Sequence, residues 1–315
     1  MSEYRIERSA SPSVQPFIYA RIGRPRRWWL HGLLFLFTFV TTTVYGAAVS
    51  ACFDARQSLN TDLIWAGYSL LLRGNAYLLL QGLRFSIPLL LILLAHELGH
   101  YFASRHWHVE ATLPFFLPSP FLLGTFGAFI RIKSPIYSRK ALFDIGVSGP
   151  IAGFLVLLPI LAAGTAWSQT FPHLPAGGDI AFGTPLLIRA SEWLRFGRTP
   201  VEQIALHPFA QAAWAGLLAT AINLLPIGQL DGGHILYALF GPLHKVLSRI
   251  FVAVLVPMGY FSYSWLFWAL LLFILGVRHP LVYDDEPLDK NRKVIAMAAL
   301  LIFVLSICLT PVRLR

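Results

Sequence analysis

The sequence predicts an all-α polytopic membrane protein with six or seven transmembrane helices. Of its 315 residues, 56% are hydrophobic and only 13% are charged, whereas soluble domains carry about 25% charged residues. The mean hydropathy is +0.63. Apolar runs recur along the whole chain, and a run of about 20 residues crosses a bilayer core of about 30 Å. A single buried helix does not explain this pattern, so we expect the chain to lie in a lipid bilayer.

The spans follow one another with short connections. A basic tail ends at Trp28 and Trp29, which are expected as interfacial anchors. Trp265 and Trp268 are expected to face lipid or the interface. The segment 246–276 forms either one long tilted helix or a tight pair that turns at Gly259–Ser264. The other expected spans are 30–51, 78–104, 143–166, 207–226 and 294–310. In the 143–166 span, Gly146, Gly149 and Gly153 are expected to allow close contact with another helix.

The basic residues give an orientation. A net charge of +10 would suit a nucleic-acid-binding protein, but the Lys and Arg residues lie in the connections between apolar runs. The tail 1–29 holds six and the 105–145 connection holds five, against two in 52–76 and three in 167–206. The positive-inside rule places the N-terminus and the 105–145 connection in the cytosol. We expect no nucleic acid as a partner, and the lack of an apparent transit peptide favours a bacterial inner membrane.

The second span contains His96-Glu97-Leu98-Gly99-His100, an H-E-x-x-H motif. Ionisable side chains are costly within a membrane and are usually functional there. Histidines four residues apart share one helix face and can bind one metal ion. Glu97, offset by one residue, can reach a water molecule and act as the general acid/base of a zinc hydrolase. The alternative is that both histidines only bond to neighbouring helices, but the motif favours one catalytic Zn²⁺ per chain.

Two histidines leave a zinc site one protein ligand short. The segment 223–234, NLLPIGQLDGGH, follows the fourth span and contains Pro226 and three glycines. Broken helices at membrane depth are tolerated mainly where they line a cavity. We therefore expect Asp231 to be the third ligand. His234 is the competing candidate, and its alternative role is a helix cap or a contact beside the ligands.

These motifs together resemble the site-2 protease family of intramembrane zinc metalloproteases, in the form without a PDZ domain. The resemblance rests on His96-Glu97-x-x-His100 in one span and Asn223-x-x-Pro226…Asp231-Gly232 in a later one. It covers residues 77–240 and extends through Gly124-Thr-Phe-Gly127, Ile132-Lys-Ser-Pro135 and Ser148-Gly149-Pro150-x-x-Gly153. One position departs from the family, which often has a second proline where this chain has Gly228.

The resemblance implies an endopeptidase that cleaves a transmembrane protein or peptide near the cytosolic face, for regulated intramembrane proteolysis or membrane-peptide clearance. It implies that His96, His100 and Asp231 bind zinc, that Glu97 is the general acid/base, and that Asn223 orients the substrate or stabilises the oxyanion. The connections are too short for an added peptide-binding module. Substrate selection would then rest on the membrane core, an adaptor or an upstream protease.

This organisation divides the chain into four parts. A three-helix catalytic core is expected within 77–240, the intramembrane metalloprotease core. Before it lie the cytosolic basic tail, 1–29, and a first transmembrane helix with an external loop, 30–76. The C-terminal transmembrane helices, 241–315, follow it.

A small membrane-associated β-hairpin is expected near 112–135. Phe129, Arg131 and Lys133 alternate there with Ile130 and Ile132, which is a strand pattern. A substrate helix must unwind before cleavage, and an edge strand could pair with its freed backbone by β-augmentation. The alternative is a hairpin that only covers the active site. The expected substrate-binding residues are Gly124, Gly127, Phe129, Ile130 and Arg131.

Two other functions compete with an intramembrane endopeptidase. Another membrane metallohydrolase, such as a prenyl-protein protease, would share H-E-x-x-H but should take a Glu or His from another span as its third ligand. A non-catalytic transporter or scaffold would use the ionisable residues as a relay and would bind no zinc.

Overall fold

The computed structural model describes residues 28–57, 59, 61–171, 180–275, 282 and 286–314. The expected basic tail lies outside them, apart from its last two residues, Trp28 and Trp29. The helices are α1 (Trp28–Ala55), α2 (Thr61–Leu72), α3 (Ala76–Gln81), α4 (Leu83–His106), α5 (Arg139–Trp167), α6 (Leu186–Phe196), α7 (Pro208–Asn223), α8 (Asp231–Phe240), α9 (His244–Met258), α10 (Tyr263–Leu275) and α11 (Lys290–Ser306). The strands are β1 (Phe115–Pro118), β2 (Thr125–Phe129), β3 (Gln169–Thr170), β4 (Ile180–Phe182), β5 (Ile204–Ala205) and β6 (Val312–Leu314).

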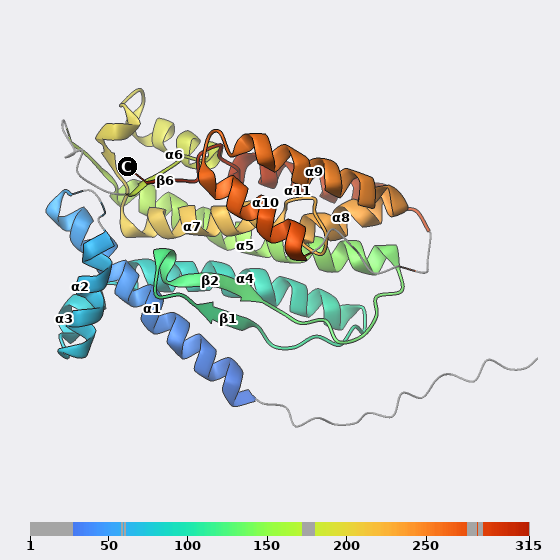
Figure 1. Cartoon of the computed structure of the whole chain (residues 1–315), viewed down its shortest axis with the longest axis horizontal. Helices are drawn as coiled ribbons and strands as arrows, with labels where there is room; N and C mark the ends of the chain where they lie inside the picture. Colours follow the sequence, from blue (N-terminus) through green and yellow to red (C-terminus); the bar gives the residue numbers. More distant parts are fainter. Residues whose placement is uncertain are drawn as a thin grey trace, which may run out of the picture.

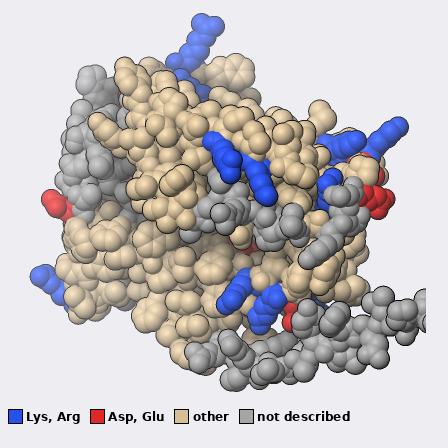
Figure 2. Space-filling view, turned by 45° about the vertical axis from the view of Figure 1, so that its right-hand side comes forward, with Lys and Arg blue, Asp and Glu red and all other residues tan. Residues whose placement is uncertain are grey.

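The predicted α-helical membrane fold is confirmed. Within the described residues, four helical stretches are long and apolar enough to cross a membrane: 28–55, 83–106, 139–167 and 231–258. The expected fourth span, α7, has 16 residues. The 246–276 segment forms two helices, α9 and α10, rather than one long helix. Six or seven spans therefore stays a prediction. Uncharged residues dominate the visible surface, and the charged ones are confined to a few places (Figure 2).

Three helices form the centre of the molecule. α4, α5 and α7 run alongside one another (Figure 1). Ile92 of α4, Leu157 of α5 and Leu217 of α7 belong to one buried apolar cluster. This packing matches the three-helix core that the sequence predicted, and it fixes the relative positions of the helices that carry the H-E-x-x-H motif and Asn223.

The predicted hairpin is also present. β1 and β2 pair antiparallel, with Phe115 opposite Phe129 and Leu117 opposite Gly127, and the register shifts between Leu117 and Pro118. An isolated bridge between Ala111 and Ile132 continues the pairing. The hairpin lies against α1 and α4 (Figure 1). It therefore lies beside the helix that carries the H-E-x-x-H motif.

α6 lies between α5 and α7 in the chain and carries a buried acid. The Glu192 side chain is 3% exposed, and Nη1 of Arg189 lies 3.8 Å from its Oε2. Among the residues that the structure describes, none forms a hydrogen bond with this Oε2. Loss of hydration raises the pKa of Glu192 to about 7, although the Arg189 charge opposes this rise.

We expect Glu192→Gln to stabilise the protein at pH 8 and to change its stability little at pH 4.5. The unfolded chain ionises Glu192 near its ordinary pKa of 4.5, whereas the folded chain keeps the proton until about pH 7. Folded-state stability therefore falls as the pH rises from 4.5 through 7, and glutamine removes this loss. Thermal unfolding at both pH values measures it. Glu202→Gln, at an exposed position in the same connection, is the control, and an equal effect of both variants would contradict the prediction.

Candidate metal centre

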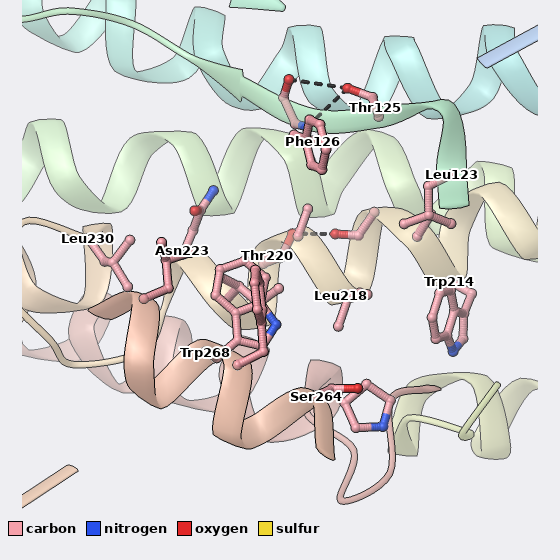
Figure 3. A pocket seen from close by; sticks show the side chains of 18 of the residues that line it. Leu123, Thr125, Phe126, Trp214, Leu218, Thr220, Asn223, Leu230, Ser264 and Trp268 are labelled. Carbon is pink, nitrogen blue, oxygen red and sulfur yellow. Dashed lines mark hydrogen bonds between the residues drawn. The ribbon is translucent and has the colours of Figure 1, made fainter. Parts of the chain in front are cut away.

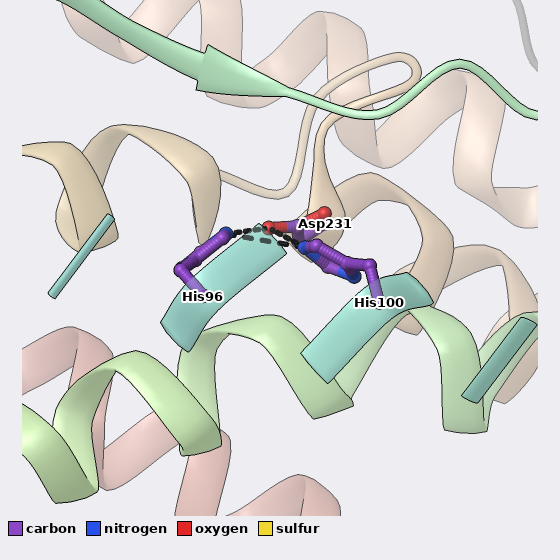
Figure 4. A group of neighbouring side chains, drawn as sticks. All are labelled: His96, His100 and Asp231. Carbon is purple, nitrogen blue, oxygen red and sulfur yellow. Dashed lines mark hydrogen bonds and ion pairs between the residues drawn. The ribbon is translucent and has the colours of Figure 1, made fainter. Parts of the chain in front are cut away.

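Three side chains from two helices meet at the end of the core. His96 and His100 lie one turn apart on α4, and Asp231 is the first residue of α8. The Nε2 atoms of the two histidines are 3.1 Å apart. Asp231 Oδ2 lies 3.1 Å from Nε2 of His96 and 3.2 Å from Nε2 of His100 (Figure 4). All three side chains are almost fully enclosed, with at most 15% exposed.

The geometry of this group fits a metal ion. Two ligand atoms that are 2.0–2.1 Å from a tetrahedral zinc lie about 3.3 Å from each other, close to the separations found here. The Ile145 carbonyl oxygen is 2.7 Å from Nδ1 of His100. Because a carbonyl only accepts, Nδ1 carries the proton and Nε2 of the neutral ring keeps its lone pair. The lone pair of this nitrogen and the Asp231 carboxylate oxygen thus meet beside Nε2 of His96, an arrangement that a cation stabilises.

A tight turn brings Asp231 to the histidines. Asn223 ends α7, and the chain reverses through residues 224–230 before α8. Gly228 has φ of 56°, whereas proline is restricted to about −65°, so the missing second proline agrees with the shape of this turn. A Cβ on Gly232 would lie 2.1 Å from the Leu224 carbonyl oxygen. Glycine is therefore required after Asp231 for the turn to close.

Glycines on α5 make room for the two histidine rings. A Cβ on Gly149 would lie 2.1 Å from Nε2 of His100, and one on Gly153 would lie 3.1 Å from Cβ of His96. The sequence indicated these glycines as points of close helix contact. In the structure, Gly149 leaves the space that the His100 ring occupies.

Glu97 and Asn223 lie next to this group. Glu97 is 4% exposed, interacts electrostatically with all three side chains and accepts a hydrogen bond from the Ile130 backbone. The amide nitrogen of Asn223 lies 3.2 Å from Nε2 of His96. His234 does not join the converging group among the described residues. Its Cβ lies 2.9 Å from where a Cβ on Gly146 would stand, so it packs against α5.

A cavity of about 1730 Å³ opens beside the group. Glu97 is the only carboxylate among its described lining residues, which are mostly apolar. Phe126 points into it from β2, and Asn223 and Trp268 approach from the other side (Figure 3). The space therefore leads from an apolar environment directly to the candidate metal centre.

Only some of the predicted substrate-binding residues lie at the cavity. Of the described residues, Gly127 and Phe129 line the cavity, whereas Gly124, Ile130 and Arg131 are not among its lining. The Ile130 backbone bonds to Glu97 instead, and the Arg131 carbonyl accepts from the Thr112 amide at 3.0 Å. Sequence reasoning missed Phe126, although it lies in the same strand pattern.

The expectation for the two tryptophans on α10 was wrong. Trp268 lines the cavity, and Trp265 is 2% exposed and donates to the Leu309 carbonyl oxygen at 2.7 Å. α10 therefore forms one wall of the cavity. No local sequence signal distinguishes this wall from a lipid-facing helix, because α10 is apolar on all sides.

Comparison with known proteins gives consistent matches. The family model described as peptidase family M50 matches residues 84–266, which include the converging side chains. "Probable zinc metalloprotease EGY1, chloroplastic" of Oryza sativa subsp. japonica is 37% identical over 163 residues, 48% of this chain and 27% of that protein. "Probable zinc metalloprotease EGY2, chloroplastic" of Arabidopsis thaliana is 32% identical over 243 residues, 75% of this chain and 43% of that protein. This chain thus spans less than half the length of these relatives.

Proposed function

Because the chain belongs to peptidase family M50, the site-2 protease family, we propose that it is an intramembrane zinc endopeptidase. It hydrolyses peptide bonds of transmembrane proteins near the cytosolic face. The observation that carries this proposal is the convergence of His96, His100 and Asp231 beside Glu97 at the wall of an apolar cavity. The names of the relatives support zinc as the metal.

The residues around the centre have distinct roles in hydrolysis. His96, His100 and Asp231 would hold zinc, which activates water and polarises a carbonyl group in such sites. Glu97 takes a proton from the attacking water and delivers it to the nitrogen of the leaving peptide. The Asn223 amide, at the edge of the cavity, donates a hydrogen bond to the oxygen of the scissile carbonyl. The Ile145 carbonyl keeps the His100 ring oriented.

The cavity suits a membrane-embedded substrate. Its lining is largely apolar and aromatic, and β2 forms part of its wall. Backbone groups freed when a substrate helix unwinds need partners where water is scarce. The β2 strand can supply them by β-augmentation. The bilayer is the other partner, and an adaptor or upstream protease would complete substrate selection.

We propose a multi-pass membrane protein with a cytosolic N-terminus, but we do not propose a particular membrane. The apolar helices support a multi-pass membrane protein, and the distribution of Lys and Arg supports a cytosolic N-terminus. The relatives are named chloroplastic, so their names do not support the bacterial inner membrane that the sequence analysis expected.

Asp231 favours this function over its closest rival. For a prenyl-protein protease or a similar membrane hydrolase, the third ligand is expected to be a Glu or His on another span. Here Asp231, which follows the turn after α7, lies within hydrogen-bonding distance of both histidines. The other alternative, a metal-free transporter or scaffold, can be told apart by the zinc content of the purified protein, because it requires no zinc.

Metal removal tests the proposal. The purified full chain, reconstituted in vesicles, should contain about one zinc and cleave a model transmembrane substrate. A chelator should abolish cleavage, and added zinc should restore it, because the proposed reaction needs the metal to activate water and the metal is held only by side chains of the folded protein. Cleavage of a prenylated peptide but not of the transmembrane substrate would favour the rival hydrolase. Zinc-free protein, or cleavage that withstands the chelator, would overturn the proposal.

A further inference from the structure

The hairpin is held by α1, a helix outside the three-helix core. At one end, Nδ1 of His31 lies 3.1 Å from the Pro114 carbonyl oxygen, and the His31 ring packs at a tilt of 33° against the Phe115 ring, with 4.0 Å between the ring centroids. At the other end, the Thr41 hydroxyl donates to the Gly124 carbonyl oxygen at 2.6 Å. Two contacts ten residues apart on α1 therefore fix the start of β1 and the turn before β2.

The Thr41 contact is the closer of these attachments. The Thr41 hydroxyl also lies near carbonyl oxygens of its own helix, those of Phe37 at 3.0 Å and Thr38 at 3.2 Å. The Gly124 oxygen is the nearest of the three, and a hydroxyl has a single proton to donate. The hydrogen bond thus links α1 to the hairpin instead of only closing a turn of α1.

The backbone before β2 is tightly constrained. Leu123 has φ of 65° and Gly124 has φ of 70°, a region that side chains other than glycine rarely adopt. A Cβ on Gly124 would lie 2.5 Å from both the Thr41 carbonyl oxygen and Cα of Thr42. The turn is therefore in direct backbone contact with α1. Any loosening of this contact displaces the start of β2.

The β2 strand connects the turn at Gly124 with the candidate active site. β2 begins at Thr125, directly after the turn, and its Oγ1 accepts from the Gly127 amide at 3.0 Å and donates to the Leu117 carbonyl at 2.8 Å. Residues 125–129 all line the cavity. The next residue, Ile130, bonds through its backbone to Glu97. One short strand thus connects the α1 contact with the proposed general acid/base.

We propose that Thr41 is a positioning residue that holds β2 in the register and at the distance at which its edge meets an unwound substrate. The proposal rests on the proposed function, since it deepens the role of the same site. Thr41 touches neither the metal ligands nor the cavity. Its effect is therefore expected in substrate binding and not in metal binding or in the chemical step.

Three variants of the full reconstituted chain separate this role from general support of α1. Thr41→Val keeps the shape and removes the hydroxyl, whereas Thr41→Ser keeps the hydroxyl. Thr42→Val is the matched control, because the buried Thr42 hydroxyl donates to the Thr38 carbonyl of its own helix at 2.7 Å. The measurements are zinc content, kcat and KM for a transmembrane substrate, and hydrogen exchange of peptides covering 121–130.

We expect Thr41→Val to raise KM about 5- to 10-fold, which corresponds to the loss of one hydrogen bond. Its kcat and zinc content should match wild type, and exchange across 121–130 should become faster. Thr41→Ser and Thr42→Val should match wild type in every measurement. An unchanged KM and exchange in Thr41→Val would overturn the proposal. So would an equal effect of Thr42→Val, or loss of zinc from Thr41→Val.

The failure of the proposed function would look different. In that case the wild-type chain itself would lack zinc or would not cleave the transmembrane substrate. The exchange measurement needs neither substrate nor metal. It therefore still decides whether the Thr41 hydroxyl holds the hairpin in place.

Discussion

Replacing Glu97 by glutamine is expected to abolish cleavage while the protein keeps its zinc. Glutamine has nearly the same shape, and its side-chain oxygen can still accept the Ile130 backbone hydrogen bond. It has no carboxylate to take a proton from water, and such proton transfer contributes about 10²- to 10⁴-fold to a rate. The converging atoms belong to His96, His100 and Asp231, so metal binding should survive. Zinc content and kcat, measured on the same preparation, test both parts.

Asp231→Asn is the informative comparison for Glu97→Gln. It removes the negative charge that lies 3.1–3.2 Å from both imidazole nitrogens, and a zinc ligand must be deprotonated. This variant should lose zinc as well as activity. The assignment of roles would be wrong if Glu97→Gln cleaved at the wild-type rate, or if it lost zinc as Asp231→Asn does.

The parts of the site that the sequence could predict are set by local geometry. His96 and His100 are four residues apart, and any helix places such residues on one face. The segment 223–234 combines a proline, three glycines and an acid after an apolar run, which indicates a break in a helix within the membrane. The structure brings these two segments together, although His96 and Asp231 are 135 residues apart in the sequence.

The contacts between spans could not be predicted in this way. A helix that is apolar on every side gives no periodic signal for the face that packs against its neighbours. Trp268 therefore looked like a lipid-facing residue, and nothing local linked Thr41 to Gly124, 83 residues later. Arg292 of α11 binds Asp144 of α5, with 2.6 Å between Nη2 and Oδ2, across 148 residues. Such pairs depend on the fold as a whole and have no signature in either segment.

The glycines of α5 show the same limit. Their spacing indicated close contact between helices but did not say what each contact makes room for. In the structure, Gly146, Gly149 and Gly153 face three different side chains: His234, His100 and His96. The three glycines look alike in the sequence, but a side chain added at each of them would contact a different histidine.

Gly149→Ala is expected to weaken zinc binding about 100-fold or more. The added Cβ would stand 2.1 Å from Nε2 of His100, the atom that should bind the metal. The ring cannot simply move aside, because its Nδ1 is bonded to the Ile145 carbonyl at 2.7 Å. Changing the outer contacts of a ligand alone costs about 10- to 100-fold in metal affinity, and here the ligand itself is displaced. Competition with a chelator of known affinity measures the effect.

Two neighbouring substitutions make the test specific. Gly146→Ala meets the His234 Cβ at 2.9 Å, outside the metal group, and Gly153→Ala meets the His96 Cβ at a milder 3.1 Å. Alanine favours a helix interior over glycine by about 0.5–1 kcal/mol, so a loss of affinity cannot come from a weakened helix. The expected order of zinc affinity is Gly146→Ala near wild type, then Gly153→Ala, then Gly149→Ala. Wild-type affinity in Gly149→Ala would mean that His100 is not held against α5 as the structure shows, and the proposed ligand set would have to be revised.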